Sequence, residues 1–291
     1  MATQRVDFTC WADSVAGVER MEAALREEGA SSASPLEVCV ELGADGVRTG
    51  ARTVPEAVAV AERIVRSPVL RLAGVAGYEG ALAHDRSAAA HAAVTAYLER
   101  MLELHRRISH LYDDGEVMVT AGGSVYFDLV ADVFGPVQQE FPRTAWVLRS
   151  GAYVIHDHGI DAELSPLAHR KREEENLRAA LTAVAQVVSR PEPHLAYLDA
   201  GKRDLAYDEG LPVPLGYARA VGDPWQPLPG ATVTAMNDQH AFVDLGASTD
   251  VEVGDVMVLG MSHPCAMVDR WRTLPVVAPD GTVVDLVHTY F

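Results

Sequence analysis

Short apolar runs alternate with amphipathic stretches through the first half of the chain. Each apolar run has the length of a buried strand, and the stretches between them repeat apolar positions with the period of a helix. The expected strands are residues 6–11, 36–42, 70–75, 117–121 and 144–148, and the expected helices are residues 14–28, 54–66 and 87–111. Ser14 and Ser87 stand at positions suited to helix N-caps. Strands alternating with helices at this spacing predict βαβ units and a parallel sheet.

The pattern changes near residue 150, where Gly and Pro become dense and short β-type runs follow. These runs are residues 231–236, 241–245, 256–259, 273–277 and 283–288, which predict an antiparallel β domain. We place the boundary at 148–160 and expect domains 1–150 and 151–291. Residues 173–188 have helix-forming composition, yet Leu181, Ala183, Ala185 and Val187 alternate as in a strand. From the residues alone, both interpretations of this segment stay open.

Composition narrows the classes of partner and compartment. The chain has 291 residues, with 24 Lys and Arg against 41 Asp and Glu, a net charge of −17. This acidity argues against nucleic acid, because nothing offsets phosphate repulsion. Three scattered cysteines form no disulfide framework and predict a reducing, cytoplasmic setting, and no apolar run has membrane-spanning length. Only two lysines, Lys171 and Lys202, are available for chemistry.

Polar or Gly-rich elements follow three of the predicted parallel strands. Gly122-Gly123-Ser124 comes after the strand 117–121, where free backbone N–H groups and a hydroxyl suit a phosphate. Arg48 and Tyr78 follow the two preceding strands. Each feature has a simpler explanation: a tight turn, a surface ion pair, a capping ring. Their gathering at one end of the sheet is more informative than any single member, because barrel active sites lie there.

His263 and Cys265 form a candidate metal half-site near the end of the chain. On an extended segment, side chains two positions apart point to the same side, and imidazole with thiolate suits a soft divalent ion such as zinc. A neighbouring His and Cys without function is the plain alternative. His240 is either a group that orients a metal ligand or a solvated turn residue. The run His156-Asp157-His158 has metal-ligand types, but alternation separates Asp157 from its neighbours.

Seven short motifs punctuate the chain: Arg48-Thr49-Gly50, Gly77-Tyr78-Glu79-Gly80, Gly122-Gly123-Ser124, Gly151-Ala152-Tyr153, Asp199-Ala200-Gly201, Asn237-Asp238-Gln239-His240 and Ser262-His263-Pro264-Cys265. They fall in the order seen in the D-serine dehydratase / D-threonine aldolase family. The chain thus resembles fold-type III pyridoxal-phosphate enzymes, relatives of alanine racemase, over nearly its whole length. The resemblance implies an α/β fold: a partial alanine racemase-like (β/α) barrel followed by a C-terminal antiparallel β domain.

The resemblance also implies roles for individual residues. Gly122, Gly123 and Ser124 would bind the phosphate of pyridoxal phosphate, with Tyr78, Arg48 and Tyr153 nearby. His263 and Cys265 would ligate Zn²⁺, which assists departure of a substrate β-hydroxyl group. The implied protein is a lyase that acts on D-3-hydroxy amino acids as a homodimer. His-Pro-Cys resembles the branch that converts D-serine to pyruvate and ammonia; aldol cleavage of D-threonine is the alternative. The family's long strand before Asp199 favours a strand at about 179–189.

One expected element of the family is absent from the chain. These enzymes carry a Schiff-base lysine on the first barrel strand, and Lys171 and Lys202 lie in the wrong part of the sequence. The resemblance therefore implies a lysine encoded upstream of Met1, so this chain alone is expected to be inactive. A companion chain supplying the missing half is a second interpretation. A third interpretation belongs to another functional class: the chain is a relic that only binds metal or cofactor, or a non-catalytic pyridoxal-phosphate carrier.

Overall fold

The computed structural model describes residues 8–149, 151–168, 176–247 and 250–290. The chain divides into two compact units, Met1–Ser150 and Gly151–Phe291. The expected first strand begins at residue 6, which lies outside the described residues; the described part of that strand is β1, Thr9–Ala12. In the part of the chain that the structure describes, no helix combines the length and apolarity needed to cross a membrane.

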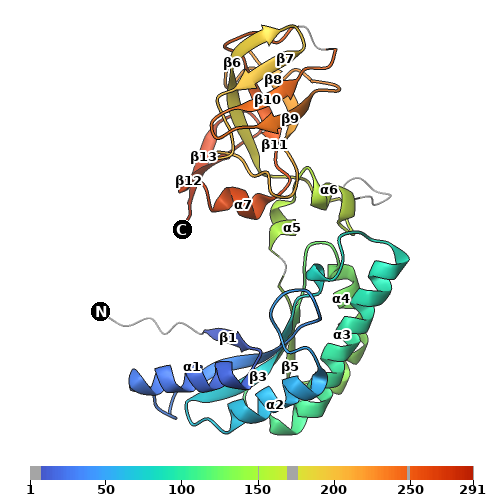
Figure 1. Ribbon diagram of the computed structural model, residues 1–291, viewed down its shortest axis with the longest axis vertical. Helices are drawn as coiled ribbons and strands as arrows, with labels where there is room; N and C mark the ends of the chain where they lie inside the picture. Colours follow the sequence, from blue (N-terminus) through green and yellow to red (C-terminus); the bar gives the residue numbers. More distant parts are fainter. Residues whose placement is uncertain (1–7, 150, 169–175, 248–249, 291) are drawn as a thin grey trace. The chain divides into compact units, whose positions relative to one another are not determined.

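Unit 1 is a five-stranded parallel sheet with strand order β1-β2-β3-β4-β5. The strands after β1 are β2 (Leu36–Leu42), β3 (Leu70–Gly77), β4 (Val117–Ala121) and β5 (Thr144–Leu148). Helices α1 (Val15–Glu27), α2 (Val54–Val65), α3 (Ala88–Ile108) and α4 (Phe127–Phe134) pack on one face of the sheet (Figure 1). Sequential parallel strands with helices on one face are the arrangement of part of a (β/α) barrel.

Local sequence explains where these helices begin. The Ser14 side chain accepts a hydrogen bond from the Gly17 N–H at the start of α1, and Thr53 and Glu56 form a reciprocal capping box at α2. Ser87 caps α3, as the sequence predicts. Among the four α-helices that the structure describes in unit 1, α4 is the one that the pattern did not predict. Helix α4 has only eight residues and begins soon after the glycine turn, so its sequence is too short to show a clear helical period of apolar positions.

The core between the helices and the sheet contains a buried histidine. His105 on α3 is almost fully buried against Phe141 and Trp146. Its Nδ1 lies 3.0 Å from the Tyr112 hydroxyl, and its Nε2 lies 3.2 Å from the Thr144 hydroxyl. Burial, with a smaller effect of the neighbouring Arg106 charge, lowers the pKa of His105 to about 4. The folded state therefore holds this imidazole neutral.

Acidification should destabilise unit 1 through His105. Its pKa is lower in the folded state than the ordinary 6.5, so the unfolded chain binds the extra proton as the pH falls from 6.5 to about 4. The loss approaches about 3 kcal/mol at the bottom of that window. Denaturant unfolding across pH 4–7 should show this slope in the wild type and a flatter one in His105→Gln. An NMR titration placing the His105 pKa near 6.5 would contradict the expectation.

Unit 2 is built on a six-stranded antiparallel sheet with order β8-β11-β6-β7-β10-β9. Its strands are β6 (Thr182–Glu192), β7 (Leu195–Leu198), β8 (Val213–Ala218), β9 (Thr232–Met236), β10 (Ala241–Asp244) and β11 (Val256–Gly260), and a separate hairpin pairs β12 (Thr273–Val277) with β13 (Val283–His288). Short helices α5 (Ala152–Ile155), α6 (Ile160–Leu164) and α7 (Pro264–Val268) complete the unit. Of the contested segment 173–188, residues 173–175 lie outside the described residues, and residues 182–188 belong to strand β6, as the family resemblance implied. The expected α/β fold class is confirmed.

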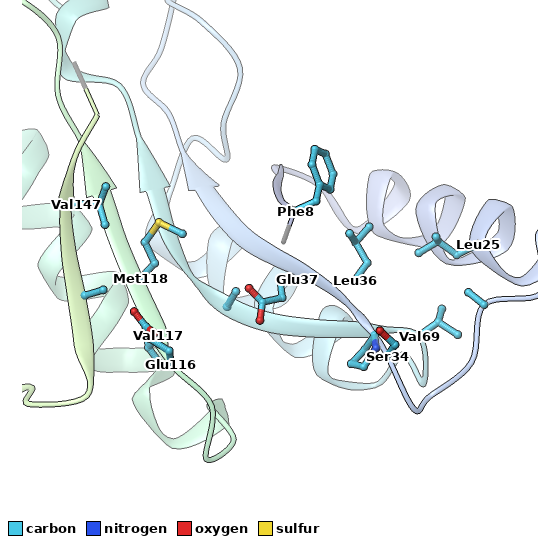
Figure 2. Close-up of a pocket in the computed structure, with 14 residues that line it drawn as sticks. Phe8, Leu25, Ser34, Leu36, Glu37, Val69, Glu116, Val117, Met118 and Val147 are labelled. Carbon is cyan, nitrogen blue, oxygen red and sulfur yellow. The ribbon is translucent and has the colours of Figure 1, made fainter. Parts of the chain in front are cut away.

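The open face of the parallel sheet holds a hollow of about 740 Å³ (Figure 2). Glu37, Met118 and Val147 line it from β2, β4 and β5. Leu36 and Val117, the first residues of their strands, also line it, so the hollow lies toward the amino ends of the strands. The candidate cofactor residues follow the carboxyl ends, and none of them lines this hollow.

Candidate functional site

Three candidate residues of unit 1 meet beyond the carboxyl ends of the parallel strands. Tyr78 directly follows β3, and the Arg48 guanidinium carbon lies 4.8 Å from the centre of its ring, a cation–π contact. A Cβ added to Gly123 would lie 3.2 Å from the Tyr78 ring, so the glycine turn after β4 packs against the same side chain. The structure thus brings Arg48, Tyr78 and Gly123 together.

The N–H groups of the two glycines already have an anionic partner. The Gly122 N–H donates to Glu79 Oε2 at 2.9 Å, and the Gly123 N–H donates to Glu79 Oε1 at 2.5 Å. Glu79 is fully buried. Gly122 has φ +128°, a conformation that favours glycine, which lets two successive N–H groups point at one carboxylate. The turn does form an anion-binding nest, and its occupant is a side chain of the protein.

Sequence reasoning did not single out Glu79 or Arg149. Glu79 was visible only as an acidic residue inside a Gly-Tyr-Glu-Gly turn. Arg149 directly follows β5, donates to the Gly77 carbonyl, and has its guanidinium carbon 5.4 Å from the centre of the Trp11 ring. Its Nε is buried without a hydrogen-bond partner among the described residues. Arg149 therefore adds a cation to the same end of the sheet. Ser124, half-buried, is the third residue of the glycine turn.

The metal candidates His263 and Cys265 lie where β11 gives way to a helix. The expectation of an extended segment is wrong for Cys265. His263 is extended, with φ −148° and ψ 92°, but Pro264 opens helix α7, and Cys265 lies in its first turn. Proline suits that position because its fixed φ is helical and its missing N–H would be unpaired there anyway. The two side chains therefore do not follow the two-residue repeat of a strand.

Both candidates nevertheless share acidic neighbours. His263 Nδ1 lies 2.6 Å from Asp208 Oδ2. Burial, and then the nearby charges of Asp161, Asp208 and Asp157, raise the pKa of the Cys265 thiol. In the absence of a cation, these carboxylates disfavour the thiolate, and a bound cation would reverse that effect. In the part of the chain that the structure describes, no three His, Cys, Asp or Glu residues are arranged as a complete metal-binding group.

A buried acid lies next to this pair. Asp161 is 2% exposed, and its Oδ2 has no hydrogen-bond partner among the described residues. Burial, reinforced by the charge of Asp157, raises the pKa of Asp161 to about 6. Asp157 Oδ1 accepts hydrogen bonds from the Gly159 and Asp161 N–H groups at 2.8 and 2.9 Å. Asp157 therefore accepts hydrogen bonds from the local backbone, while Oδ2 of Asp161 accepts none among the described residues.

The remaining candidates take separate places. Tyr153 lies half-buried on α5, in unit 2. His240 is exposed in the turn between β9 and β10, where its carbonyl accepts from the Asn237 N–H. Lys202 lies over the Tyr207 ring in unit 2, and Lys171 falls outside the described residues. The candidates for cofactor and metal therefore form two groups, one in each unit, with Tyr153 in neither.

Comparisons with solved structures define the fold. The chain superposes on an alanine racemase-like protein from Idiomarina loihiensis with a TM-score of 0.67 at 14% identity, covering 95% of this chain and 70% of the other. It superposes on D-threonine aldolase from Filomicrobium marinum with a TM-score of 0.75 at 21% identity, covering 97% and 69%. The fold of this chain is thus that of part of an alanine racemase-like (β/α) barrel followed by a β domain.

Sequence comparisons then define the relatives. Residues 180–277 match the family described as "Putative serine dehydratase domain". The chain is 26% identical over 277 residues to D-threonine aldolase of Arthrobacter sp, covering 94% of this chain and 64% of the relative. It is 27% identical over 215 residues to 3-hydroxy-D-aspartate aldolase of Paracoccus denitrificans, covering 72% and 50%. The resemblance indicated by the motifs is confirmed, and the chain spans 64% and 50% of these relatives' lengths.

Proposed function

We propose that this chain is part of a pyridoxal-phosphate and zinc-dependent lyase that acts on D-3-hydroxy amino acids. The observation that carries the proposal is the pair His263 and Cys265 inside the segment that matches the serine dehydratase domain. Two relatives found by sequence are aldolases named for D-threonine and 3-hydroxy-D-aspartate. D-threonine and 3-hydroxy-D-aspartate are both D-amino acids with a β-hydroxyl group, and this is the substrate class that we propose. A homodimer is part of the proposal because the family resemblance implies it, and light scattering tests it.

The donor types of His263 and Cys265 fit zinc. Imidazole and thiolate are its usual protein ligands, and a catalytic zinc keeps positions open for water or substrate. A structurally similar protein, D-threo-3-hydroxyaspartate dehydratase, has been described as a metal-free cysteine-to-alanine variant and as a histidine-to-alanine variant, at positions two residues apart in that chain. The same residue types occur here at the same spacing, which supports the zinc proposal. The ion would supply a Lewis acid at the substrate β-hydroxyl group.

The cofactor residues fit pyridoxal phosphate with one adjustment. Glu79 takes the N–H groups of Gly122 and Gly123, so Ser124, with its hydroxyl and N–H, is the turn residue left for the phosphate. Arg48 and Tyr78 would stand beside it. When bound, the cofactor supplies an electron sink for the carbanion at the substrate Cα. Residues 1–150 contain no lysine that could form a Schiff base with the cofactor. Experiments on this chain by itself should therefore measure ligand binding rather than turnover.

Dehydration of D-serine to pyruvate and ammonia is our preferred reaction. The structurally similar protein with the His and Cys variants is a dehydratase, which favours elimination for a His-Pro-Cys segment. Aldol cleavage of D-threonine is the second candidate, favoured by the names of the sequence relatives. Product analysis with an active protein containing this chain distinguishes them: pyruvate from D-serine in one case, glycine and acetaldehyde from D-threonine in the other.

Purified chain should bind about one zinc ion, and Cys265→Ala or His263→Ala should lose most of it, because a single remaining ligand holds the ion weakly. Elemental analysis after gel filtration measures the stoichiometry. Cys10→Ala is the control, since it removes a half-buried thiol from unit 1, and should keep the metal. Zinc retained by both site variants, or absent from the wild type after zinc addition, would reject the metal proposal.

A further inference from the structure

We propose that Asp208 is a positioning residue that sets the tautomer and orientation of His263. The inference rests on the proposed metal site and adds a residue to it. His263 Nδ1 and Asp208 Oδ2 are 2.6 Å apart. An ionised carboxylate only accepts hydrogen bonds, so a neutral imidazole in this contact carries its hydrogen on Nδ1. Nε2 is then left with its lone pair free, which is the state that a metal ligand requires.

The segment that carries Asp208 is hydrogen-bonded to the segment that carries His263, before and after the contact between these two residues. Residues 202–210 and 262–271 are joined by four further hydrogen bonds: Ser262 Oγ to the Gly210 carbonyl (2.6 Å), the Ala206 N–H to Met267 Sδ (3.1 Å), Trp271 Nε1 to the Asp204 carbonyl (2.9 Å) and an Arg270 guanidinium N–H to the Lys202 carbonyl (2.7 Å). These bonds bracket the Asp208–His263 contact. Its geometry is therefore set by the packing of two chain segments.

Burial within these two segments adds to the rigidity. Leu205 and Ala206 are buried in the core of unit 2, and Met267 is buried beside them. Asp208 and His263 themselves keep side-chain exposures of 47% and 32%. A core that anchors the backbone while leaving the two polar tips accessible is suited to a site that must take up an ion from solvent.

The other acidic groups near His263 do not compete for this role. Asp157 is committed to the N–H groups of Gly159 and Asp161. Asp161 is close enough for its charge to interact with His263, but among the described residues its Oδ2 makes no hydrogen bond. Asp208 is thus the carboxylate that contacts the imidazole directly. A bare surface ion pair is the competing explanation, since it requires only a protonated His263 and no preferred tautomer.

Two measurements on Asp208 variants test the inference. The first is the ¹⁵N–¹H correlation spectrum of the metal-free protein at pH 8, where His263 should show the Nδ1–H tautomer in the wild type. Asp208→Ala should shift it toward the Nε2–H form. The second is zinc affinity by chelator competition, which should fall roughly 10- to 100-fold in Asp208→Ala. Asp208→Asn should lose less, because its amide oxygen still accepts from Nδ1–H. Glu209→Gln, which removes the neighbouring exposed charge, should match the wild type in both.

The outcomes separate this inference from the metal proposal. A wild-type protein that binds no zinc but shows the Asp208-dependent tautomer would reject the metal site and support the positioning role of Asp208. A wild type that binds zinc while Asp208→Ala keeps both its tautomer and its affinity would overturn the inference alone. An equal loss of affinity in Asp208→Asn and Glu209→Gln would also overturn it, because general charge would then explain the effect.

Discussion

Glu79→Ala is expected to lower the free energy of unfolding of unit 1 by roughly 3–5 kcal/mol. The fully buried carboxylate is the acceptor for two N–H groups, from Gly122 and Gly123. Without it, two buried donors lose their partners, each at a cost of about 1–3 kcal/mol, and a cavity remains. Chemical denaturation followed by circular dichroism measures the loss. The proposed binding of pyridoxal phosphate should weaken together with stability, because the glycine turn carries Ser124, the residue proposed to hold the phosphate.

Glu56→Ala supplies a matched control for Glu79→Ala. Glu56 also accepts a backbone hydrogen bond, from the Thr53 N–H at 2.9 Å, but in an exposed capping box. Its loss should cost about 1 kcal/mol, since water replaces the carboxylate. Glu79→Gln should fall between the two, because its amide oxygen can serve one N–H while its NH₂ group faces the other. If Glu79→Ala costs no more than Glu56→Ala, the carboxylate does not organise the turn.

Gly74→Ala is expected to have an effect of comparable size on the parallel sheet. Gly74 has φ +146°, and an added Cβ would overlap the Met118 carbonyl on the neighbouring strand β4. The pairing of β2 with β3 shifts register at this glycine, so the bulge depends on close backbone approach. Backbone strain and overpacking together should cost roughly 3–5 kcal/mol. Thermal and denaturant unfolding measure it.

Gly135→Ala is the control for the substitution at Gly74. Gly135 has φ −54° and ψ −51°, and an added Cβ would meet nothing within 4 Å. Alanine there should be neutral or stabilise by up to about 1 kcal/mol, because it restricts the unfolded chain without strain. Equal stability of the two variants would contradict this expectation, because it would show that strands β3 and β4 can separate enough to accommodate a Cβ at residue 74.

The strands that the sequence predicted best are those buried on one or both faces. In β2, Val38, Val40 and Leu42 contact the helices while Cys39 faces the other way, so the strand is recognisable although it also carries two glutamates. Strand β8 was missed because Pro214 and Gly216 interrupt it. It lies at the edge of the six-stranded sheet, where a proline is tolerated. Strand β7 has only four residues, too few for a period.

For the candidate site, too, some features were predictable from the sequence and others were not. The chain pattern by itself determined the parallel sheet, the antiparallel domain and the residue types of both candidate groups, since these depend on local periodicity and composition. Tertiary structure alone decided that Glu79 takes the N–H groups of Gly122 and Gly123, and that Asp208 contacts His263 from 55 residues away. Such contacts join segments that only packing brings together, and no local pattern encodes the distance between them.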